Sequence, residues 1–441
     1  MRRIAAARGR AAAALLAAGL LLAACTRSST SSGSAPSASA GSAAPAAGRP
    51  IVSAQPNPLC DYPAPSTAAP PSPAALPGYV QRIAGQVEQV RDLKFVHPVA
   101  PEPVTQEQLN ESLRSQVEQQ LPKDLVDGEG QAWMTIGVIP RGTDLRAALL
   151  DYYGSQILGY YDTNTQRLVF VGSSTPNAYQ QFVLSHELTH ALDDQRLRFG
   201  PLADDLQQTC QDERSSAFTA LIEGDAVSNS VRWAQRFLTQ DQLGQLNQEA
   251  TEGSPPPATI PSFVLSLQSF PYTAGLSFVR ALEQRGGESA VDAAFRSPPL
   301  STEQILHPSR YPSDRPIPVV VPDLSSHLGP QWRLIDQAQP GEDWLRLMLA
   351  LHLPETQAES AAAGWGGAEY RAWSDGTHSA VLMKTVWDTA PDAGQFAAAV
   401  RSWLPQAGTM GEVETLDGTV SVLFASDAPT LQRLEAVTGA D

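Results

Sequence analysis

The sequence predicts an α+β fold in which a mostly helical region with a short β-hairpin is followed by a smaller α+β module. Three observations lead to this prediction. Apolar residues recur at helical spacing over much of residues 79–308. The pattern changes to that of a hairpin within residues 157–171, and after residue 370 short strand patterns alternate with helical ones. The chain has 441 residues, which is enough for two or three domains with cores of their own.

The N-terminus, residues 1–24, has the composition of an export signal peptide. A basic start is followed by an apolar run that is too short and too rich in alanine for a comfortable membrane span. The run ends in L-A-A-C, which resembles the lipobox of bacterial lipoproteins. That resemblance implies cleavage before Cys25 and lipidation of its thiol, so we expect an exported protein anchored on the outer face of the cytoplasmic membrane. An ordinary signal peptide with an incidental cysteine is the alternative.

Residues 25–77 are expected to form a flexible tether and a proline-rich linker, because Ser, Ala, Gly and Pro dominate them and leave little to bury. Two cysteines remain beyond the lipobox, Cys60 and Cys210. In an exported protein such a pair is most simply a disulfide, and two separate buried thiols are the alternative.

The chain is acidic, with 46 Asp and Glu against 30 Lys and Arg and a net charge of −16. The leader carries four of the arginines, so its removal makes the remainder more acidic. A surface of this charge argues against nucleic acid as a partner and against electrostatic docking on anionic lipid. We therefore expect membrane contact only through the lipid anchor.

The first elements of the folded region are expected to be helices at residues 79–93, 105–121 and 144–153, with a short extended piece at residues 95–96. Thr105 and Gln108 have the spacing of a capping box. A β-hairpin is then expected to pair residues 157–161 with residues 167–171. Its second strand can be the sheet edge along which an extended peptide adds itself, and a purely structural hairpin is the alternative.

A buried helix that begins near Thr175 and Pro176 is expected to carry the chemistry, because it contains the sequence H-E-L-T-H. His186 and His190 are four residues apart, so both imidazoles lie on one face and can bind one metal ion. Glu187 lies about a hundred degrees further round the helix, beside such an ion. Two neutral imidazoles, an open position for water and a nearby carboxylate to accept a proton are the parts of a zinc hydrolase. A chance match on a core helix is the alternative.

A second helix, expected at residues 213–238 after a polar loop, offers the third metal ligand. We expect Glu223 in that role, because the small residues Gly224 and Ala226 allow a close approach of the two helices. Asp225 is the competing ligand, or it orients an imidazole through the other ring nitrogen. Asp194, four residues after His190, is the other candidate for such an orienting contact. A solvated surface carboxylate is the alternative for Glu223.

The H-E-L-T-H-A-L-D-D-Q run followed by E-G-D-A resembles the gluzincin class of zinc metallopeptidases, in particular a set of bacterial exported peptidases. The resemblance implies that His186, His190 and Glu223 are zinc ligands and that Glu187 is the general base. It also implies a zincin-like metallopeptidase domain, which we expect at residues 78–315.

Residues 261–308 are expected to be helical, most clearly at residues 272–284 and 288–295, and to form the other wall of a cleft. Zinc hydrolases often add a donor that stabilises the oxyanion formed when water attacks a carbonyl. Tyr272 and His307 are the candidates for this catalytic role, with Tyr311 a weaker one. A structural role is the alternative for each.

Residues 316–441 are expected to form an α+β accessory module without a cluster of metal-binding side chains. The G-W-G-G run at residues 364–367 is expected to be a turn. The expected elements are an extended connector at 316–322, helices at 332–353, 355–363, 393–403 and 430–437, and strands at 370–373, 379–386, 412–416 and 420–425.

These features together predict a lipid-anchored zinc metallopeptidase that acts on a peptide or protein substrate. Two alternatives remain. One is a non-catalytic envelope lipoprotein that keeps a vestigial or structural metal site and binds a partner. The other is a zinc hydrolase that acts on a non-peptide amide, such as one in the cell wall.

Overall fold

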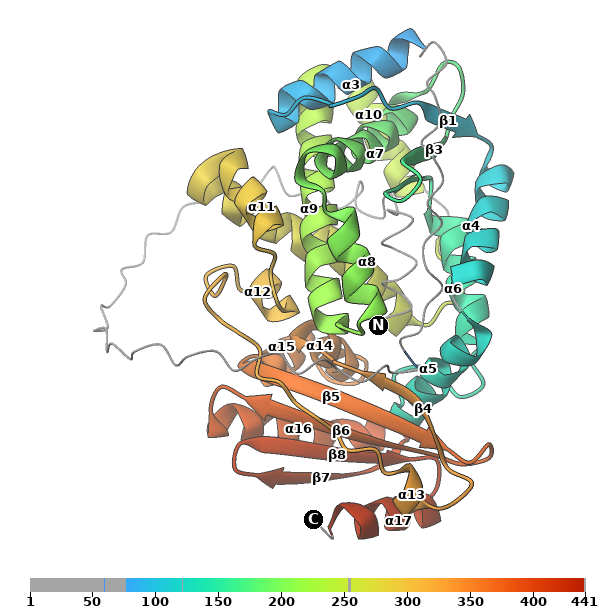
Figure 1. Cartoon of the computed structure of the whole chain (residues 1–441), viewed down its shortest axis with the longest axis vertical. Helices are drawn as coiled ribbons and strands as arrows, with labels where there is room; N and C mark the ends of the chain where they lie inside the picture. Colours follow the sequence, from blue (N-terminus) through green and yellow to red (C-terminus); the bar gives the residue numbers. More distant parts are fainter. Residues whose placement is uncertain (1–58, 60–76, 121, 253–254, 440–441) are drawn as a thin grey trace, which may run out of the picture.

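The computed structural model describes residues 59, 77–120, 122–252 and 255–439. In these ranges the chain is α+β, as predicted: a helical body carries a three-stranded sheet, and a five-stranded sheet with its own helices follows it (Figure 1). The leader, the tether, Cys25 and Cys60 lie outside the described residues. Cys210 is disulfide-bonded, and its pairing with Cys60 stays a prediction. None of the helices in the described ranges is both long enough and apolar enough to cross a membrane.

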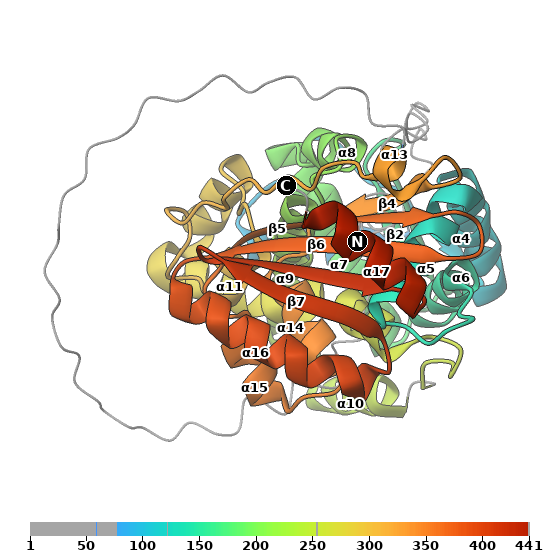
Figure 2. The same cartoon turned by 90° about the horizontal axis from the view of Figure 1, so that it is seen from below.

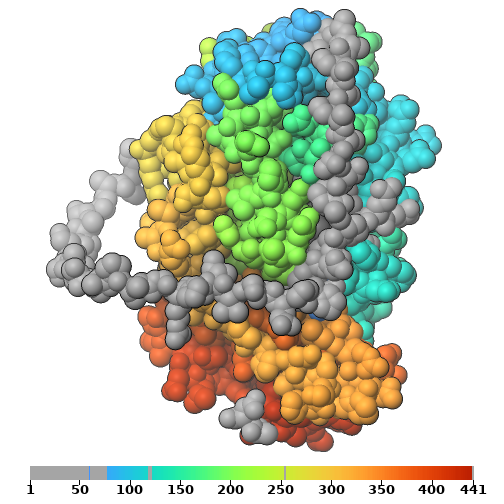
Figure 3. Space-filling model, in the orientation of Figure 1, coloured from blue at the N-terminus to red at the C-terminus, as the bar shows by residue number. Residues whose placement is uncertain are grey.

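The helical body contains most of the chain. Its helices are α3 (Gly78–Arg91), α4 (Gln106–Gln120), α5 (Lys123–Ile136), α6 (Leu145–Gln156), α7 (Ala178–Leu197), α8 (Gly200–Gln208), α9 (Asp212–Phe237), α10 (Gln240–Glu252), α11 (Ser262–Arg296) and α12 (Thr302–Leu306). Figure 3 shows one face of the molecule, with the green surface of α8 and α9 between α3 above and the orange and red C-terminal region below.

The small sheet of the helical body differs from the prediction in the position of its edge. Its strands are β1 (Pro101–Val104), β2 (Gly159–Asp162) and β3 (Arg167–Val171), in the order β1-β3-β2. The predicted hairpin is present, since β2 and β3 pair antiparallel, but β1 pairs parallel with β3. The second hairpin strand is therefore central, and the two edge strands are β1 and β2. Strand β1 was not predicted, because it contains Pro101 and Pro103 and proline is disfavoured in strands except at a sheet edge.

Helix starts follow local capping chemistry. The capping box of Thr105 and Gln108 is formed, as predicted, by two reciprocal hydrogen bonds at the start of α4. The start of α7 was predicted two residues too early: Asn177, not Thr175, caps it in a box with Gln180. Asn177 has a glutamine three residues later, whereas Thr175 is followed at that spacing by Ala178, which cannot close a box.

Three helices of the helical body were not predicted at all, one of them α10 at residues 240–252. Helix α5 lies at residues 123–136, and α8 occupies residues 200–208, where a polar loop was expected. The polar and small residues of α8 (G-P-L-A-D-D-L-Q-Q) give only a weak apolar pattern. Residues 95–96, expected to be extended, are not part of a strand.

Helices α9 and α11 pass close to each other in the centre of the helical body (Figure 1). They cross at Gly224 and Gly275, where a Cβ on Gly224 would lie 2.2 Å from the carbonyl carbon of Gly275. The small residue at 224 thus permits the approach of α11, whereas it was predicted to permit the approach of α7. Helix α11 kinks at Gly286 and Gly287, between the two segments predicted as clearest.

The C-terminal region is one antiparallel sheet with helices on both faces (Figure 2). Helix α16 packs on one face together with α5, and α17 packs on the other. The elements are α13 (Ser325–Leu328), β4 (Arg333–Ala338), α14 (Glu342–Ala350), α15 (Glu355–Ala362), β5 (Trp365–Ser374), β6 (Ser379–Trp387), α16 (Ala390–Ala407), β7 (Met410–Leu416), β8 (Thr419–Ala425) and α17 (Ala428–Thr438), with strand order β4-β5-β6-β8-β7.

Two predictions for the C-terminal region were wrong. Residues 333–338 form strand β4, not the start of a helix, because they pair with β5 and because Pro340 and Gly341 separate them from α14. Within the predicted turn at residues 364–367, only Gly364 has a left-handed backbone, with φ +79°. Trp365 already begins β5, and a register shift before Gly367 accommodates the bend.

The helical body and the C-terminal sheet share one hydrophobic core. Helix α5 connects them: the Trp133 indole N–H donates to the Tyr370 hydroxyl at 3.2 Å, and the hydroxyls of Thr135 and Ser379 lie 2.6 Å apart. A single cluster of buried apolar residues continues from α3 to β8. The C-terminal sheet is therefore packed against the body that holds the candidate site.

Candidate metal centre

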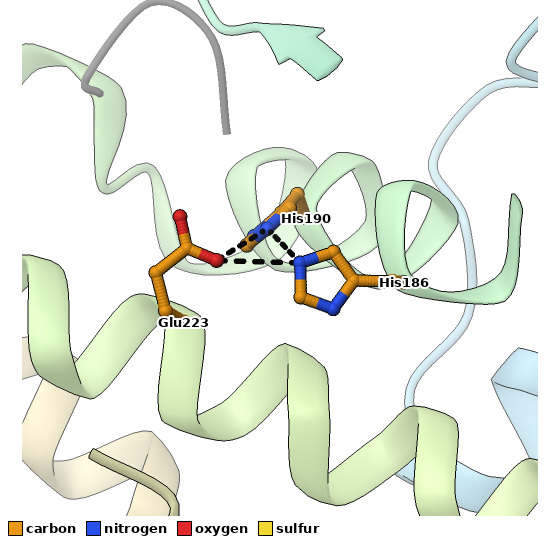
Figure 4. Close-up of side chains that lie close together, drawn as sticks. All are labelled: His186, His190 and Glu223. Atoms are coloured by element: carbon orange, nitrogen blue, oxygen red, sulfur yellow. Dashed lines mark hydrogen bonds and ion pairs between the residues drawn. The ribbon is translucent and has the colours of Figure 1, made fainter. Parts of the chain in front are cut away.

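The predicted metal-binding side chains converge inside the helical body (Figure 4). The Nε2 atoms of His186 and His190 on α7 lie 3.0 Å apart. The Oε2 atom of Glu223 on α9 lies 3.2 Å from the first and 3.3 Å from the second. All three residues are at most 1% exposed. The crossing of α7 on α9 thus brings two imidazoles and one carboxylate to a common point.

The separations of these three atoms fit a zinc ion. Ligands about 2.0–2.1 Å from a tetrahedral zinc stand about 3.3–3.4 Å from one another. The observed separations of 3.0, 3.2 and 3.3 Å are close to this value. Two imidazoles and one carboxylate are also a common donor set of catalytic zinc sites, which keep a fourth position open.

The charge states expected in this cluster also suit a cation. Burial and the neighbouring His190 lower the pKa of His186, which keeps its imidazole neutral. Burial alone would raise the pKa of Glu223, but the charge and hydrogen bonds of His190 and His186 outweigh burial and lower this pKa to about 2. A neutral imidazole and an ionised carboxylate are the forms that bind a metal ion.

Glu187 lies beside the three converging residues and is completely buried. Among the described residues, no side chain donates a hydrogen bond to either of its carboxylate oxygens, and the backbone N–H of Tyr161 is the group that interacts with them. Burial raises its pKa well above the ordinary value, the charge of Glu223 adds to the effect, and the backbone N–H of Tyr161 acts against it. A buried carboxylate is costly in an ordinary core. Its presence beside the metal-binding cluster indicates a chemical role.

The two orienting carboxylates were predicted wrongly, because neither contacts an imidazole. Asp194 accepts hydrogen bonds from the Tyr161 hydroxyl at 3.1 Å and from the Gly200 N–H at 3.3 Å. Asp225 faces the side chain of Arg91. In the described part of the chain, the Nδ1 atoms of both His residues lack a hydrogen-bond partner. Asp225 therefore does not face the imidazoles, whereas Glu223 does, in a group that could hold a metal ion.

Tyr272 is the predicted oxyanion donor that lies nearest the cluster. It is buried on α11, and its ring stacks on the imidazole of His186 with a centroid distance of 6.4 Å and an interplanar angle of 30°. Tyr311 lies elsewhere, packed on Phe278, with its hydroxyl donating to the Ser297 carbonyl. Of the two tyrosines, only Tyr272 stays a candidate for catalysis.

His307 is held in a different place. Its Nε2 atom lies 2.8 Å from the Glu342 carboxylate, whose hydrogen bond raises the pKa of His307. Thr302, at the start of the short helix α12 that ends just before His307, donates its hydroxyl to the Glu213 carboxylate. Glu213 precedes Glu223 by ten residues on α9, which is about 15 Å of helix. The prediction that His307 stabilises an oxyanion at the metal centre was therefore wrong.

Tyr161 on β2 is a residue of the site that the sequence did not single out. It lines a cavity together with His190 and Glu223, and its hydroxyl donates to Asp194. The cavity measures about 20 Å³, enough for roughly one water molecule. Its other walls combine apolar side chains, such as Phe199 and Phe218, with polar ones, such as Gln207 and Ser215. The only sequence signal for Tyr161 was its place at the end of a predicted hairpin strand.

Comparison with known proteins adds little to this geometry. Residues 332–435 match a family described as a domain of unknown function (DUF8575). No curated protein matches the chain. A solved structure titled "Crystal structure of a putative hydrolase with a novel fold from Chloroflexus aurantiacus" is similar at 16% identity and a TM-score of 0.33, covering 55% of this chain and 91% of that one. A likeness at this TM-score supports no conclusion about the chain.

Proposed function

We propose that the protein is a zinc-dependent peptidase, with His186, His190 and Glu223 as metal ligands. The observation that carries the proposal is the convergence of their three ligand atoms, 3.0–3.3 Å apart, beside the buried carboxylate of Glu187. A structural zinc site has four protein ligands and no use for such a carboxylate. In the described residues, the group that can hold a metal here contains three.

Bound zinc would act as a Lewis acid, polarising a substrate carbonyl and lowering the pKa of a water molecule. Glu187 would supply the base: its carboxylate would accept the proton of the attacking water and then pass it to the leaving amine. Tyr272, whose ring stacks on His186, is the neighbouring phenol that would bind the carbonyl oxygen, whereas the Tyr161 hydroxyl donates to Asp194.

The orientation of β2 supports an extended peptide as the substrate. The Val171 N–H donates to the Leu158 carbonyl at 2.7 Å. Hydrogen-bonded positions alternate along an antiparallel pair, so the peptide groups of Leu158 and Tyr160 face β3. The peptide groups of Gly159 and Tyr161 therefore face the opposite edge, and the Tyr161 N–H acts on Glu187. Gly159, Tyr160 and Tyr161 are buried, so a peptide that paired with this edge would be enclosed next to the base. A small amide would not need such an edge.

The proposal includes anchorage on the outer face of the cytoplasmic membrane. Its support is the leader at residues 1–24 and the lipobox resemblance at Cys25. The test of this part is metabolic labelling with a fatty acid: the chain should incorporate label and Cys25→Ala should not.

The activity is tested with Glu187→Gln and a zinc-loaded wild type on a fluorogenic peptide library. The variant should keep its zinc and lose about 10²–10⁴-fold in kcat. Glu249→Gln is the matched control, because Glu249 is a partly exposed carboxylate that contacts the cap of the same helix at Asn177. It should cleave at the wild-type rate. Cleavage by Glu187→Gln at the wild-type rate would refute the role of the base.

A further inference from the structure

Arg91, at the C-terminal end of α3, is a fully buried arginine surrounded by four carboxylates. Its Nε atom lies 2.9 Å from Asp225 and 3.0 Å from Asp193. Its two terminal nitrogens lie 2.9 Å from Glu288 and 2.7 Å from Asp292. Asp193 and Asp225 are almost as deeply buried as the arginine. A guanidinium suits this place because its donors lie in one rigid fork.

The contacts of Arg91 connect four helices. Asp193 belongs to α7, Asp225 to α9, and Glu288 and Asp292 to the last part of α11. Two of these helices, α7 and α9, carry all three ligands of the proposed metal centre. Arg91 is therefore a cross-link between the helix of the imidazoles and the helix of the carboxylate.

Further polar contacts hold the arginine and its partners in place. Asn229 donates to Asp225 at 2.9 Å, and Arg232 donates to Asn229 at 2.8 Å. Arg232 also pairs with Glu288, which returns to Arg91. The result is a closed ring of hydrogen bonds and ion pairs through α3, α9 and α11. A ring of this kind permits little rotation of any one helix.

The cross-link is close to the ligands along both helices. Asp193 follows His190 by three residues, about 4.5 Å of helix, and lies on the same face. Asp225 follows Glu223 by two residues, about 3 Å of helix. A rotation of α7 by about 5° would move an atom about 6 Å from its axis by about 0.5 Å. That exceeds the tolerance of about 0.2 Å for a metal–ligand distance.

We propose that Arg91 is a positioning residue of the metal centre, setting the rotation of α7 against α9 so that the imidazoles and Glu223 meet at one point. The inference rests on the proposed metal site and goes beyond it, because Arg91 contacts neither metal ligand nor substrate. It adds α3, more than ninety residues before His186, to the parts that the centre requires.

The test uses the full chain stripped of metal and titrated with Co²⁺, whose visible absorption reports the ligand geometry. Affinity is measured by competition with a chelator, and far-UV circular dichroism with thermal melting checks the fold. Arg91→Lys replaces the fork with a single ammonium that cannot reach four carboxylates. Asp193→Ala removes only the contact to α7. Both should raise the dissociation constant about 10–100-fold and alter the Co²⁺ spectrum.

Two matched variants separate positioning from a general loss of stability. Asp292→Ala removes a carboxylate from the same arginine on α11, away from the ligand helices. Arg310→Lys changes another arginine that pairs with three carboxylates, Glu303, Asp314 and Asp388. Both should keep the wild-type affinity and spectrum, whatever happens to their melting temperatures.

The outcomes are distinguishable. Wild-type affinity and spectrum in Arg91→Lys and Asp193→Ala would overturn the inference and leave the metal site intact. Equal weakening in all four variants would also overturn it, because the effect would then be one of stability. If Arg91→Lys does not fold, Asp193→Ala decides. Failure of the wild type to bind Co²⁺ would refute the proposed function and this inference together, while a lack of peptidase activity alone would not affect it.

Discussion

The contact between α9 and α11 can be tested with one methyl group, because it lies next to Glu223, a proposed metal ligand. A Cβ on Gly224 would stand 2.2 Å from the Gly275 carbonyl carbon and 2.8 Å from the Leu276 nitrogen. Ordinary van der Waals contact begins at 3.4 Å, so the two backbones would have to separate by about 1.2 Å, the difference between 3.4 and 2.2 Å. Neither partner is a flexible side chain that can move aside.

We expect Gly224→Ala to destabilise the protein. Overpacking of this kind costs about 1–3 kcal/mol, and the higher helix propensity of alanine returns up to about 1 kcal/mol. Because the added methyl group would meet backbone, the upper part of that range applies, about 2–3 kcal/mol, and the net loss is then about 1–2 kcal/mol. Because Glu223 is the preceding residue, a shift of this size also exceeds the tolerance of a metal–ligand distance. The variant should therefore bind zinc more weakly as well.

The assay is urea denaturation of the metal-free protein, with zinc affinity measured by chelator competition. Gly244→Ala is the matched control: Gly244 is exposed in the middle of α10, and a Cβ there would meet no atom within 4 Å. The control should gain about 0.5–1 kcal/mol. If Gly224→Ala gains stability like the control, or binds zinc like the wild type, the close crossing of α9 and α11 is wrong.

Two further predictions concern pH and metal. Burial raises the pKa of Glu213 to about 8, although its bonds to Thr302 oppose this. The folded state then keeps a proton that the unfolded chain loses above about 4.5, so wild-type stability should fall between pH 5 and 8 by up to about 1.4 kcal/mol per pH unit. Glu213→Gln should reduce that slope in urea titrations, and an unchanged slope would contradict the assignment. Zinc at about 100 times its dissociation constant should stabilise the chain by about 2.7 kcal/mol. Calorimetry with and without chelator checks this, and a similar zinc effect in His186→Ala would argue against the ligand set.

Some features of this protein follow from residues close together in the chain. The spacing of His186 and His190 places both imidazoles on one face of any helix that contains them, so the pair was predictable without a fold. The capping box of Thr105 and the hairpin of β2 and β3 are equally local. Where a local signal was ambiguous, as at residues 333–338, the pairing with β5 decided between strand and helix.

The third ligand shows the limit of such reasoning. Glu223 and Asp225 are two residues apart, so they point about 200° apart round α9 and either can face a neighbouring helix. Nothing in the order of residues says which side α7 crosses. In the fold, α7 meets the side of Glu223, and Arg91 takes Asp225. His307 was wrongly predicted at the site for the same reason, because the order of residues does not say which helices lie beside α12.

The sequence by itself determined the parts of the proposed site: an H-E-x-x-H helix, a carboxylate beside the imidazoles, and a second helix with acidic residues. Only the tertiary structure decided which carboxylate faces the imidazoles, that Tyr161 and Tyr272 border them, and that Arg91 connects α7 with α9. The physical reason is the separation along the chain of the residues that interact. A helical turn relates residues three or four apart through the backbone, whereas Arg91 and Asp225, separated by 134 residues, meet only because the packed core brings their helices together.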